Sequence, residues 1–224
     1  MKFFIDSANT QLIGKFLDMN IVDGVTTNPS LLAKEGANPI DQAKKILKLV
    51  PGPVSIEVVA TEYDKMVNEA RSISKLGKNA VVKIPMTKEG MHAVHTLSQE
   101  NIKINVTLIF SATQALIAAK AGATYVSPFV GRLDDIGQNG MELVRDILLI
   151  FKNYSIKTQT LVASVRHPIH LIEAAKLGAD VATVPPDVLD RMFSHPLTDS
   201  GLKKFLDDWK TLEKQYGDVF KLPI

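Results

Sequence analysis

Ala80-Val81-Val82-Lys83-Ile84-Pro85 decides how this chain is expected to fold, because it is a short apolar run that follows Gly77 and ends at a proline. A run of this length, rich in β-branched residues and bounded by turn residues, predicts a buried strand of a parallel sheet. The run nevertheless contains Lys83. An unpaired ammonium is costly to bury, so burial favours the neutral amine, which attacks carbonyl carbons. The alternative is a lysine at the edge of the strand that extends its amine into water.

Further short apolar runs occur along the chain, and helical patterns separate them. Together they predict strands over residues 3–5, 21–25, 54–59, 80–85, 102–106, 125–128, 160–163 and 180–184. Helices are predicted over 10–17, 40–49, 63–76, 88–99, 112–121, 141–151 and 169–177. In three places a helix, a capping glycine, a strand and a proline follow one another, over 74–85, 119–128 and 175–185.

Strands that alternate with helices in this way pair in parallel, because each connection has room for a crossover helix and no two-residue hairpin occurs. Eight such units in about 250 residues are typical of an α/β protein with a (β/α)8 TIM barrel, which is the fold we expect. A doubly wound open sheet is the competing fold. It normally has a glycine-rich turn after the first strand, and Asp6-Ser7-Ala8-Asn9 is not one. We expect one barrel domain over 1–224, with 198–224 as a C-terminal helix and tail.

Composition limits the functions open to the chain. It has 224 residues, of which 46% are hydrophobic and 22% charged, with a formal net charge of +2 and no cysteine. The lack of cysteine excludes disulfides, thiol nucleophiles and thiolate metal sites, and without a basic cluster we expect no nucleic-acid partner. The first apolar run ends early, at Asp6, and no run is long enough to span a membrane, so we expect a cytoplasmic protein without a membrane partner. No glycine-rich nucleotide loop occurs, and we expect no cofactor.

Polar side chains fall where the predicted strands end, which is where barrels of this kind build their sites. They are Asp6, Asn28, Glu57, Lys83, Asn105, Thr107, Ser127 and Ser164. Any one of them could belong to a solvated turn, and Asp6 or Ser164 could cap the following helix. Glu57, Lys83 and Asn105, however, lie in or beside apolar strands, where a structural protein more often uses valine or isoleucine.

These residue types suit imine chemistry on a hydroxylated ketone. Lys83 would add to the carbonyl, and the resulting protonated Schiff base would accept the electrons of a neighbouring C–C bond. Two carboxylates, Asp6 and Glu57, could make the proton transfers that dehydration and bond cleavage need. The set therefore predicts a site for making or breaking a carbon–carbon bond.

Groups that could bind the rest of such a substrate are also present. Amides and hydroxyls suited to sugar hydroxyl groups are those of Asn28, Asn105, Thr107 and Ser127. Arg132 and Arg166 follow late strands, where barrels often hold phosphate, and a guanidinium binds phosphate through two N–H groups. For Arg132, a surface ion pair with Asp134 or Asp135 is an equally good interpretation.

Two histidine pairs and one apolar stripe lie outside this set. His92 and His95, like His167 and His170, are three residues apart, where helical neighbours could share a metal ion. Neither pair has a carboxylate motif such as H-E-x-x-H, so we interpret both as solvated helix faces and expect no metal. The stripe lies on one face of a predicted terminal helix and consists of Leu202, Phe205, Leu206, Trp209 and Leu212.

Four motifs of the chain resemble those of the transaldolase family, in the short branch that also includes fructose-6-phosphate aldolase. They are Val25-Thr26-Thr27-Asn28-Pro29-Ser30, Val81-Val82-Lys83-Ile84-Pro85-Met86-Thr87, Ser127-Pro128-Phe129-Val130-Gly131-Arg132-Leu133-Asp134-Asp135 and Leu161-Val162-Ala163-Ser164. The resemblance runs nearly end to end. It implies a (β/α)8 barrel with a class I aldolase site that uses no cofactor.

The resemblance also implies a role for each residue of the site. Lys83 would form the Schiff base and Asp6 would be the acid/base for C–C cleavage. Glu57, with Thr107, would place the catalytic water. The residues implied to contact the dihydroxyacetone part are Asn28, Asn105 and Ser127. Those implied to bind phosphate are Arg132, Ser164 and Arg166, and Phe129 is a further residue implied to bind the substrate.

The reaction implied is transfer of a dihydroxyacetone unit from sedoheptulose 7-phosphate to glyceraldehyde 3-phosphate, giving erythrose 4-phosphate and fructose 6-phosphate in the pentose phosphate pathway. In the related aldolase, which releases free dihydroxyacetone, the Glu57 position is similar to a glutamine and the Phe129 position to a tyrosine, so this chain resembles the transferase more. A phosphosugar isomerase with Glu57 as base, and a sugar-phosphate-binding barrel without turnover, are interpretations of a different class. The resemblance further implies a homo-oligomer, a decamer of two pentamers in which the terminal helix packs on a neighbour. The plainer alternative is that this helix packs on its own barrel.

Overall fold

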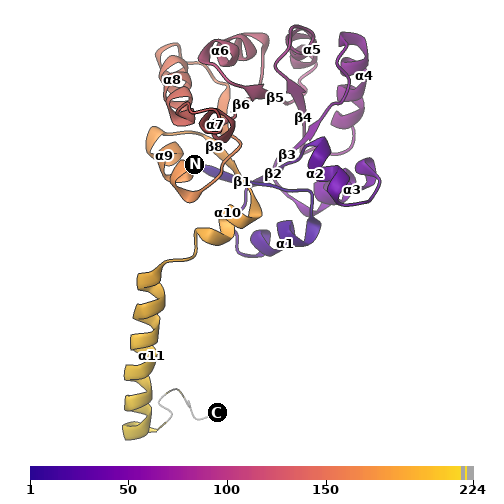
Figure 1. Ribbon diagram of the computed structural model, residues 1–224. Helices are drawn as coiled ribbons and strands as arrows, with labels where there is room; N and C mark the ends of the chain where they lie inside the picture. The colour runs from indigo at the N-terminus through magenta and orange to yellow at the C-terminus, as the bar shows by residue number, and fades with distance from the viewer. Residues whose placement is uncertain (218–219, 221–224) are drawn as a thin grey trace. The chain divides into compact units, whose positions relative to one another are not determined.

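The computed structural model describes residues 1–217 and residue 220, and the strands among them form a closed parallel barrel in chain order, with β8 paired to β1 (Figure 1). The strands are β1 (Lys2–Asp6), β2 (Gly24–Thr26), β3 (Val54–Glu57), β4 (Ala80–Pro85), β5 (Ile104–Ile109), β6 (Tyr125–Pro128), β7 (Gln159–Val162) and β8 (Val181–Val184). The predicted (β/α)8 barrel is confirmed.

Helices separate the strands along the chain, and two more follow the last strand. They are α1 (Thr10–Asp18), α2 (Pro29–Lys34), α3 (Pro39–Leu49), α4 (Tyr63–Ser74), α5 (Lys88–Gln99), α6 (Ala112–Ala121), α7 (Val130–Asp134), α8 (Gly140–Asn153), α9 (Pro168–Leu177), α10 (Pro186–Arg191) and α11 (Pro196–Tyr216). The chain forms two compact units, Met1–Leu189 and Asp190–Ile224. The barrel belongs to the first unit, and a single domain over 1–224 stays a prediction.

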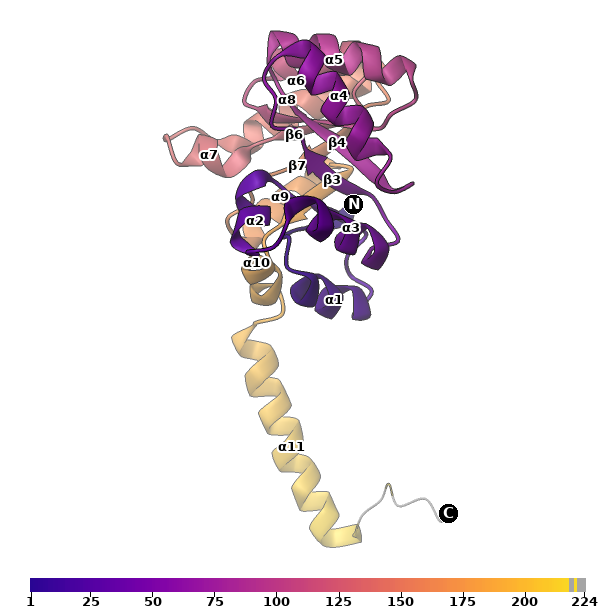
Figure 2. The same cartoon turned by 90° about the vertical axis from the view of Figure 1, so that its right-hand side faces the viewer.

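Three short helices were not predicted, and all of them directly follow a strand. α2, α7 and α10 come after β2, β6 and β8. The start of α2 explains why such a helix is hard to predict: Asn28 accepts a hydrogen bond from the backbone N–H of Leu31, and Pro29 occupies the first turn. The Thr-Asn-Pro segment predicts the end of a strand, and the same residues are also a good helix start. α2 and α7 lie at the same end of the barrel (Figure 2).

Two strand boundaries differ from prediction by three residues, and the other differences are of one or two residues. β2 begins at Gly24 and not at residue 21, and β5 runs to Ile109 and not to residue 106. The pairing of β5 with β6 shifts between Val106 and Ile109, where Leu108 has a φ of 60°. A bulge of this kind takes up one extra residue and lets the strand continue, so the apolar pattern alone placed its end too early.

Side-chain alternation along the strands gives the barrel two cores. Residues at one set of positions face the helices and join the large outer core, as Val82 and Ile84 do on β4. The intervening positions face the barrel axis and form a separate apolar cluster of Phe4, Val81, Tyr125, Leu161, Ala163 and Val181. Because side chains two apart on a strand share a face, the next inward positions after Phe4, Val81, Tyr125 and Val181 are Asp6, Lys83, Ser127 and Thr183. A polar layer therefore lies above the apolar one, toward the carboxyl ends of the strands.

The helix α5 shows how the outer core is built. Its buried residues, Gly90, Ala93, Val94 and Leu97, recur with a period of three or four residues and so share one face. Thr87 accepts a hydrogen bond from the N–H of Gly90 and caps the start of the helix. The carboxyl end of β4 is therefore followed by a helix whose position is fixed at its first turn.

The second unit contains α11, whose residues are all at least partly exposed. Phe205 of the predicted apolar stripe is 70% exposed, and Leu202, Leu206 and Leu212 are exposed as well. Of the predicted tail over 198–224, residues 218–219 and 221–224 lie outside the described part of the chain. No helix in the described part has the length and apolar composition needed to cross a membrane.

Gly24 leaves space for a ring of the inner core, and this makes a testable prediction. A Cβ at Gly24 would lie 2.7 Å from Cε1 of Phe4 and 2.7 Å from the carbonyl oxygen of Pro53. We expect Gly24→Ala to lower the free energy of unfolding by about 2 kcal/mol, because overpacking displaces the ring or the backbone.

The matched control is Gly14→Ala in α1, where a Cβ would have no neighbour within 4 Å. This variant should be stabilised by up to about 1 kcal/mol, since alanine is the better helix former. Denaturant titrations of both variants give the two values. Equal stabilities would show that Gly24 is not needed for packing.

Candidate active site

A cavity of about 180 Å³ opens among the polar residues at the carboxyl ends of the strands. Eight of the predicted site residues line it: Asp6, Asn28, Lys83, Ser127, Phe129, Arg132, Ser164 and Arg166. The other three, Glu57, Asn105 and Thr107, are not among the lining residues. The structure connects Glu57 and Asn105 to the lining residues by direct contacts.

Lys83 is buried and paired. Its Nζ lies 3.1 Å from Oε2 of Glu57 and donates a hydrogen bond of 3.1 Å to the carbonyl oxygen of Thr27. Glu57 and Lys83 are direct partners in the register of β3 and β4. The Glu57 carboxylate and the Thr27 carbonyl therefore offset the cost of burying the lysine. The expectation that the buried amine is uncharged stays a prediction.

Asp6 lies at the end of β1 and is held by a chain of hydroxyl groups. Its Oδ1 accepts a hydrogen bond of 2.7 Å from Oγ1 of Thr26, which lies 2.5 Å from Oγ1 of Thr183. Burial raises the pKa of the Asp6 carboxyl, and the Lys83 charge and the Thr26 hydrogen bond oppose that rise. A carboxyl group with a raised pKa is suited to both accepting and donating a proton near neutral pH. The N-cap of α1 is Asn9, so Asp6 is not the helix cap that was considered as an alternative.

Asn105 lies between two serines inside the barrel. Its Oδ1 accepts a hydrogen bond of 2.7 Å from Ser127, and its Nδ2 donates one of 3.2 Å to Ser55. Asn105 is also the register partner of Lys83. Two residues further along β5, the Thr107 hydroxyl is buried without a partner among the described residues. A buried hydroxyl of this kind is a hydrogen-bonding group available to a ligand.

The two arginines have different neighbours. The Arg132 guanidinium lies 5.1 Å from the ring centre of Phe129, and in residues 1–217 and 220 it forms no ion pair with an aspartate. It is Arg166 that pairs with Asp135, at 2.9 Å between Nη2 and Oδ2, in an exposed contact. The surface ion pair considered for Arg132 is therefore not found. Ser164, two residues before Arg166, has a φ of 60°, which places it in the left-handed region, as often occurs at functional sites.

The interpretation as a solvated helix face is confirmed for His92 and His95, which are both exposed, and is wrong for His167 and His170. His92 stacks on Tyr63 with ring centres 3.9 Å apart, and His170 is only 4% exposed. Nε2 of His170 lies 2.7 Å from Oδ2 of Asp134, and its ring packs against His167. Burial lowers the pKa of His170, His167 lowers it further, and Asp134 opposes both. The pattern of a helix does not show which other segment packs on it, and here Asp134 of α7 packs on His170 of α9.

The group of described residues that could hold a metal ion is Asp134, His167 and His170, whose ligand atoms lie within 4.8 Å of one another. The two rings have centroids 3.9 Å apart and are tilted by 36°. An imidazole nitrogen binds a metal in the plane of its ring, and stacked rings direct their nitrogens poorly toward one point. The cluster fits hydrogen bonding better than metal binding, and the absence of a metal stays a prediction.

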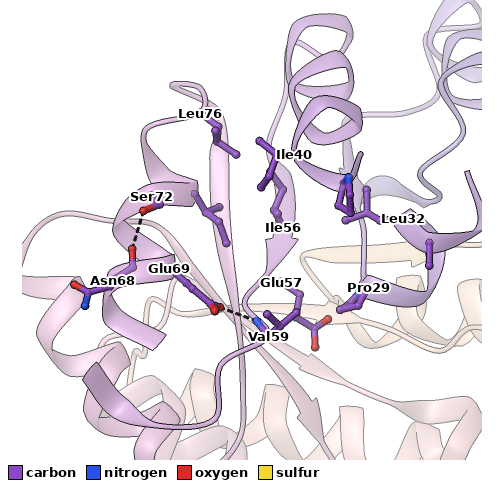
Figure 3. A pocket seen from close by; sticks show the side chains of 13 residues that line it. Pro29, Leu32, Ile40, Ile56, Glu57, Val59, Asn68, Glu69, Ser72 and Leu76 are labelled. Atoms are coloured by element: carbon purple, nitrogen blue, oxygen red, sulfur yellow. Dashed lines mark hydrogen bonds between the residues drawn. The ribbon is translucent and has the colours of Figure 1, made fainter. Parts of the chain in front are cut away.

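A larger cavity of about 760 Å³ lies on the outside of β3 (Figure 3). It is lined mainly by apolar side chains of α2, α3 and α4, such as Leu32, Ile40 and Ile73, and Glu57 lies at its edge. Glu69 borders it and accepts hydrogen bonds from the N–H groups of Val59 and Ala60. Of the predicted site residues, Glu57 lines this larger cavity, and eight others line the smaller one.

Five lining residues of the smaller cavity were not predicted: Thr26, Ala163, Val165, Thr183 and Pro185. Thr26 and Thr183 matter most, because Thr26 donates a hydrogen bond to Asp6 and Thr183 contacts Thr26. A signal for Thr183 was present, since it follows the inward-facing Val181 by two residues. It was hidden because threonine is common in strands and carries no charge.

These features define a class: a (β/α)8-barrel protein with a polar site at the carboxyl ends of its strands, centred on a buried lysine–glutamate pair. The model of the Transaldolase/Fructose-6-phosphate aldolase family matches residues 3–216. The chain belongs to this family.

Close relatives cover almost the whole chain. A "Probable transaldolase" of Methanococcus maripaludis is 62% identical over 210 residues, which are 94% of this chain and 98% of the relative. One from Anaeromyxobacter dehalogenans is 60% identical over 214 residues, 96% of this chain and 99% of the relative. Among solved structures, inosine 5'-monophosphate dehydrogenase from Legionella pneumophila is similar with a TM-score of 0.59 and 14% identity, over 84% of this chain and 58% of that one. That similarity shows the fold alone.

The hydroxyl chain at Asp6 makes a prediction about its titration. Removing the Thr26 hydroxyl in Thr26→Val should raise the pKa of Asp6 above its wild-type value, because a hydrogen bond that favours the carboxylate is lost. Thr26→Ser keeps the hydroxyl and should leave the pKa near the wild-type value. Lys83→Met should also raise it by removing a positive charge. The carboxyl carbon of Asp6, followed by NMR against pH, gives each value, and an unchanged or lower pKa in Thr26→Val would contradict the assignment.

Proposed function

We propose that the protein is a transaldolase that moves a dihydroxyacetone unit from sedoheptulose 7-phosphate to glyceraldehyde 3-phosphate, giving erythrose 4-phosphate and fructose 6-phosphate. The observation that carries the proposal is the pairing of buried Lys83 with Glu57 at 3.1 Å, with Asp6 lining the same cavity as Lys83. Relatives about 60% identical carry the name "Probable transaldolase". The reaction would serve the pentose phosphate pathway in the cytoplasm.

The first step forms the Schiff base. Glu57 takes a proton from the Lys83 ammonium, and the free amine attacks C2 of the ketose. The carbinolamine then loses its hydroxyl group as water, with the proton supplied by Glu57. A protonated imine on Lys83 and a carboxylate on Glu57 result, so the net charge of the pair is unchanged. The 3.1 Å contact places donor and acceptor at hydrogen-bond distance for this exchange.

The second step breaks the carbon–carbon bond. Asp6 accepts the proton of the C4 hydroxyl, the C3–C4 bond breaks, and its electrons move to the imine nitrogen to give an enamine. The aldose product leaves. The enamine then attacks the acceptor aldehyde, Asp6 returns the proton to the new hydroxyl group, and water hydrolyses the imine to release the ketose. The raised pKa of Asp6 suits it to both proton transfers.

The remaining residues are assigned to binding. We assign the dihydroxyacetone hydroxyl groups to Asn28, Asn105 and Ser127, and a water molecule used in dehydration to Thr107 with Glu57. The phosphate is assigned to Arg132, Ser164 and Arg166, which all line the cavity. Guanidinium groups bind phosphate strongly through paired N–H donors.

A second candidate is an aldolase that releases free dihydroxyacetone. It would use the same residues up to the enamine and differs in whether the enamine is protonated before an acceptor arrives. Phe129 forms an apolar wall of the cavity beside Arg132, and this supports the transferase, since a phenylalanine cannot supply a proton there. An isomerase or a binding protein would need no covalent bond to Lys83.

Assembly through α11 is part of the proposal. Its exposed apolar residues, Leu202 and Phe205 among them, fit a homo-oligomer such as a decamer of two pentamers. Light scattering measures the mass directly.

Reduction with borohydride tests the role of Lys83. We expect wild-type protein treated with fructose 6-phosphate and borohydride to gain the mass of a reduced sugar fragment on Lys83, because borohydride fixes an imine as a stable amine. Lys83→Arg keeps the charge but cannot form the imine, so its turnover should fall by several orders of magnitude. Peptide mass spectrometry and a coupled assay provide the two readouts.

The control for this experiment is Lys103→Arg, a lysine outside the cavity, which should keep its activity and its adduct. An adduct on another lysine, or near wild-type turnover in Lys83→Arg, would refute the assignment. A wild-type protein that turns over sugar phosphates without any adduct would favour the isomerase.

Omitting the acceptor aldehyde separates the transferase from the aldolase. With fructose 6-phosphate alone we expect about one equivalent of aldose per active site in the first turnover and little further release, since the enamine waits for an acceptor. Adding erythrose 4-phosphate should start steady turnover. Continuous release of free dihydroxyacetone without acceptor would establish the aldolase in its place.

A further inference from the structure

His170 connects the two segments that carry the arginines of the cavity. It lies in the first turn of α9 with both ring nitrogens in contact with other segments. Its Nδ1 accepts a hydrogen bond of 3.3 Å from the backbone N–H of Arg166, and its Nε2 lies 2.7 Å from Oδ2 of Asp134 at the end of α7. One side chain therefore touches both the loop after β7 and the helix after β6.

These contacts determine where the proton of His170 lies. Because Nδ1 accepts from a backbone N–H, it carries no proton, and the neutral ring must be protonated at Nε2. Nε2 then donates to Asp134, whose other oxygen accepts a hydrogen bond of 2.9 Å from the N–H of Gly140. The bridge is thus anchored at the start of α8 as well. The donors and acceptors therefore follow one order: the N–H of Arg166 donates to Nδ1 of His170, and Nε2 of His170 donates to Asp134.

The two segments also touch directly. The N–H of Gly131 donates a hydrogen bond of 3.0 Å to the carbonyl oxygen of Ser164. A Cβ at Gly131 would lie 2.2 Å from that oxygen and 2.6 Å from Cγ of Arg166. At this spacing, small shifts of either segment change how far apart the guanidinium groups of Arg132 and Arg166 lie. In addition to this backbone contact, the buried side chain of His170 links the two segments at Arg166 and Asp134.

We propose that His170 is a positioning residue that holds the Arg132 and Arg166 segments at the spacing that binds a phosphate group. This inference rests on the proposed function, in which those arginines bind the phosphate of the sugar. His170 itself does not line the cavity, so it acts through the backbone of Arg166 and through Asp134. Its loss should weaken binding of phosphorylated substrates and leave the chemistry at Lys83 unaffected.

Three substitutions separate the two contacts. His170→Phe keeps the ring volume and removes both hydrogen bonds. His170→Asn places an amide oxygen near the position of Nδ1, so it can still accept from the Arg166 N–H. His170→Gln places an amide N–H near the position of Nε2, so it can still donate to Asp134. A role in mere packing would make the phenylalanine variant the least harmful of the three.

The readout compares phosphorylated with unphosphorylated substrates. We expect His170→Phe to raise KM for fructose 6-phosphate about tenfold with kcat within about twofold of wild type, the pattern of lost ground-state binding. Its kcat/KM for fructose should be unchanged. His170→Asn and His170→Gln should each recover part of the loss. Equal losses for fructose and fructose 6-phosphate, or a wild-type KM in His170→Phe, would overturn the proposal.

Two controls keep the test decisive. His95→Phe changes an exposed histidine of α5 and should leave all constants unchanged, and Asp134→Asn should reproduce the KM effect from the other end of the bridge if His170→Phe does not fold. Dialysis against EDTA should have no effect on the wild type. A loss of activity that zinc restores would instead support a metal bound by Asp134, His167 and His170.

Failure of the proposed function is recognisable separately. If the wild type turns over no sugar phosphate, the transaldolase proposal fails, and inorganic phosphate alone then serves as the probe in calorimetric titrations. Weaker phosphate binding by His170→Phe than by the wild type would still support the positioning role. Equal binding, or no binding by the wild type, would overturn it.

Discussion

The structure depends on one ion pair, between the buried Lys83 and the partly buried Glu57 on neighbouring strands. Removing one partner of such a pair leaves a buried charge uncompensated, which typically costs about 3–5 kcal/mol. Register fixes the pair, because residues opposite each other on β3 and β4 point to the same side of the sheet. The register of β3 and β4 therefore holds the amine of Lys83 close to the carboxylate of Glu57. The same contact that makes the lysine tolerable inside the barrel therefore makes it suitable for chemistry.

The two-residue period of the strands extends this arrangement around the barrel. An apolar layer that includes Phe4, Val81 and Tyr125 fills the interior below the pair, and a polar layer lies above it. Gly24 contributes by leaving room for the Phe4 ring. Because each strand has one face toward the helices and one toward the axis, the outer core can be wholly apolar while the inner face changes character along its length. Stability and the site are thus built on opposite faces of the same short strands.

The end of the cavity that carries Arg132 and Arg166 is organised differently, since it depends on loops and not on strand register. Gly131 allows α7 to approach Ser164 closely, and Ser164 adopts a left-handed backbone conformation there. Backbone conformations of this kind persist only where surrounding contacts hold them. His170, buried beneath these loops, contacts both of them. The barrel fixes where the lysine lies, and local loop packing fixes where the arginines lie.

The sequence by itself determined the barrel and most of the polar residues that line its cavity, because short apolar runs, capping glycines and polar residues at strand ends are local signals. Glu57, Lys83 and Asn105 stood out because polar groups are rare in apolar strands. Only the tertiary structure decided which polar groups touch: that Lys83 is paired, that Thr26 and Thr183 connect to Asp6, and that Asp135 pairs with Arg166. These contacts join residues distant in the chain, and their partners follow from barrel closure and loop packing. A buried His170 under α7 was unpredictable for the same reason, since a helix's own pattern does not show what covers it.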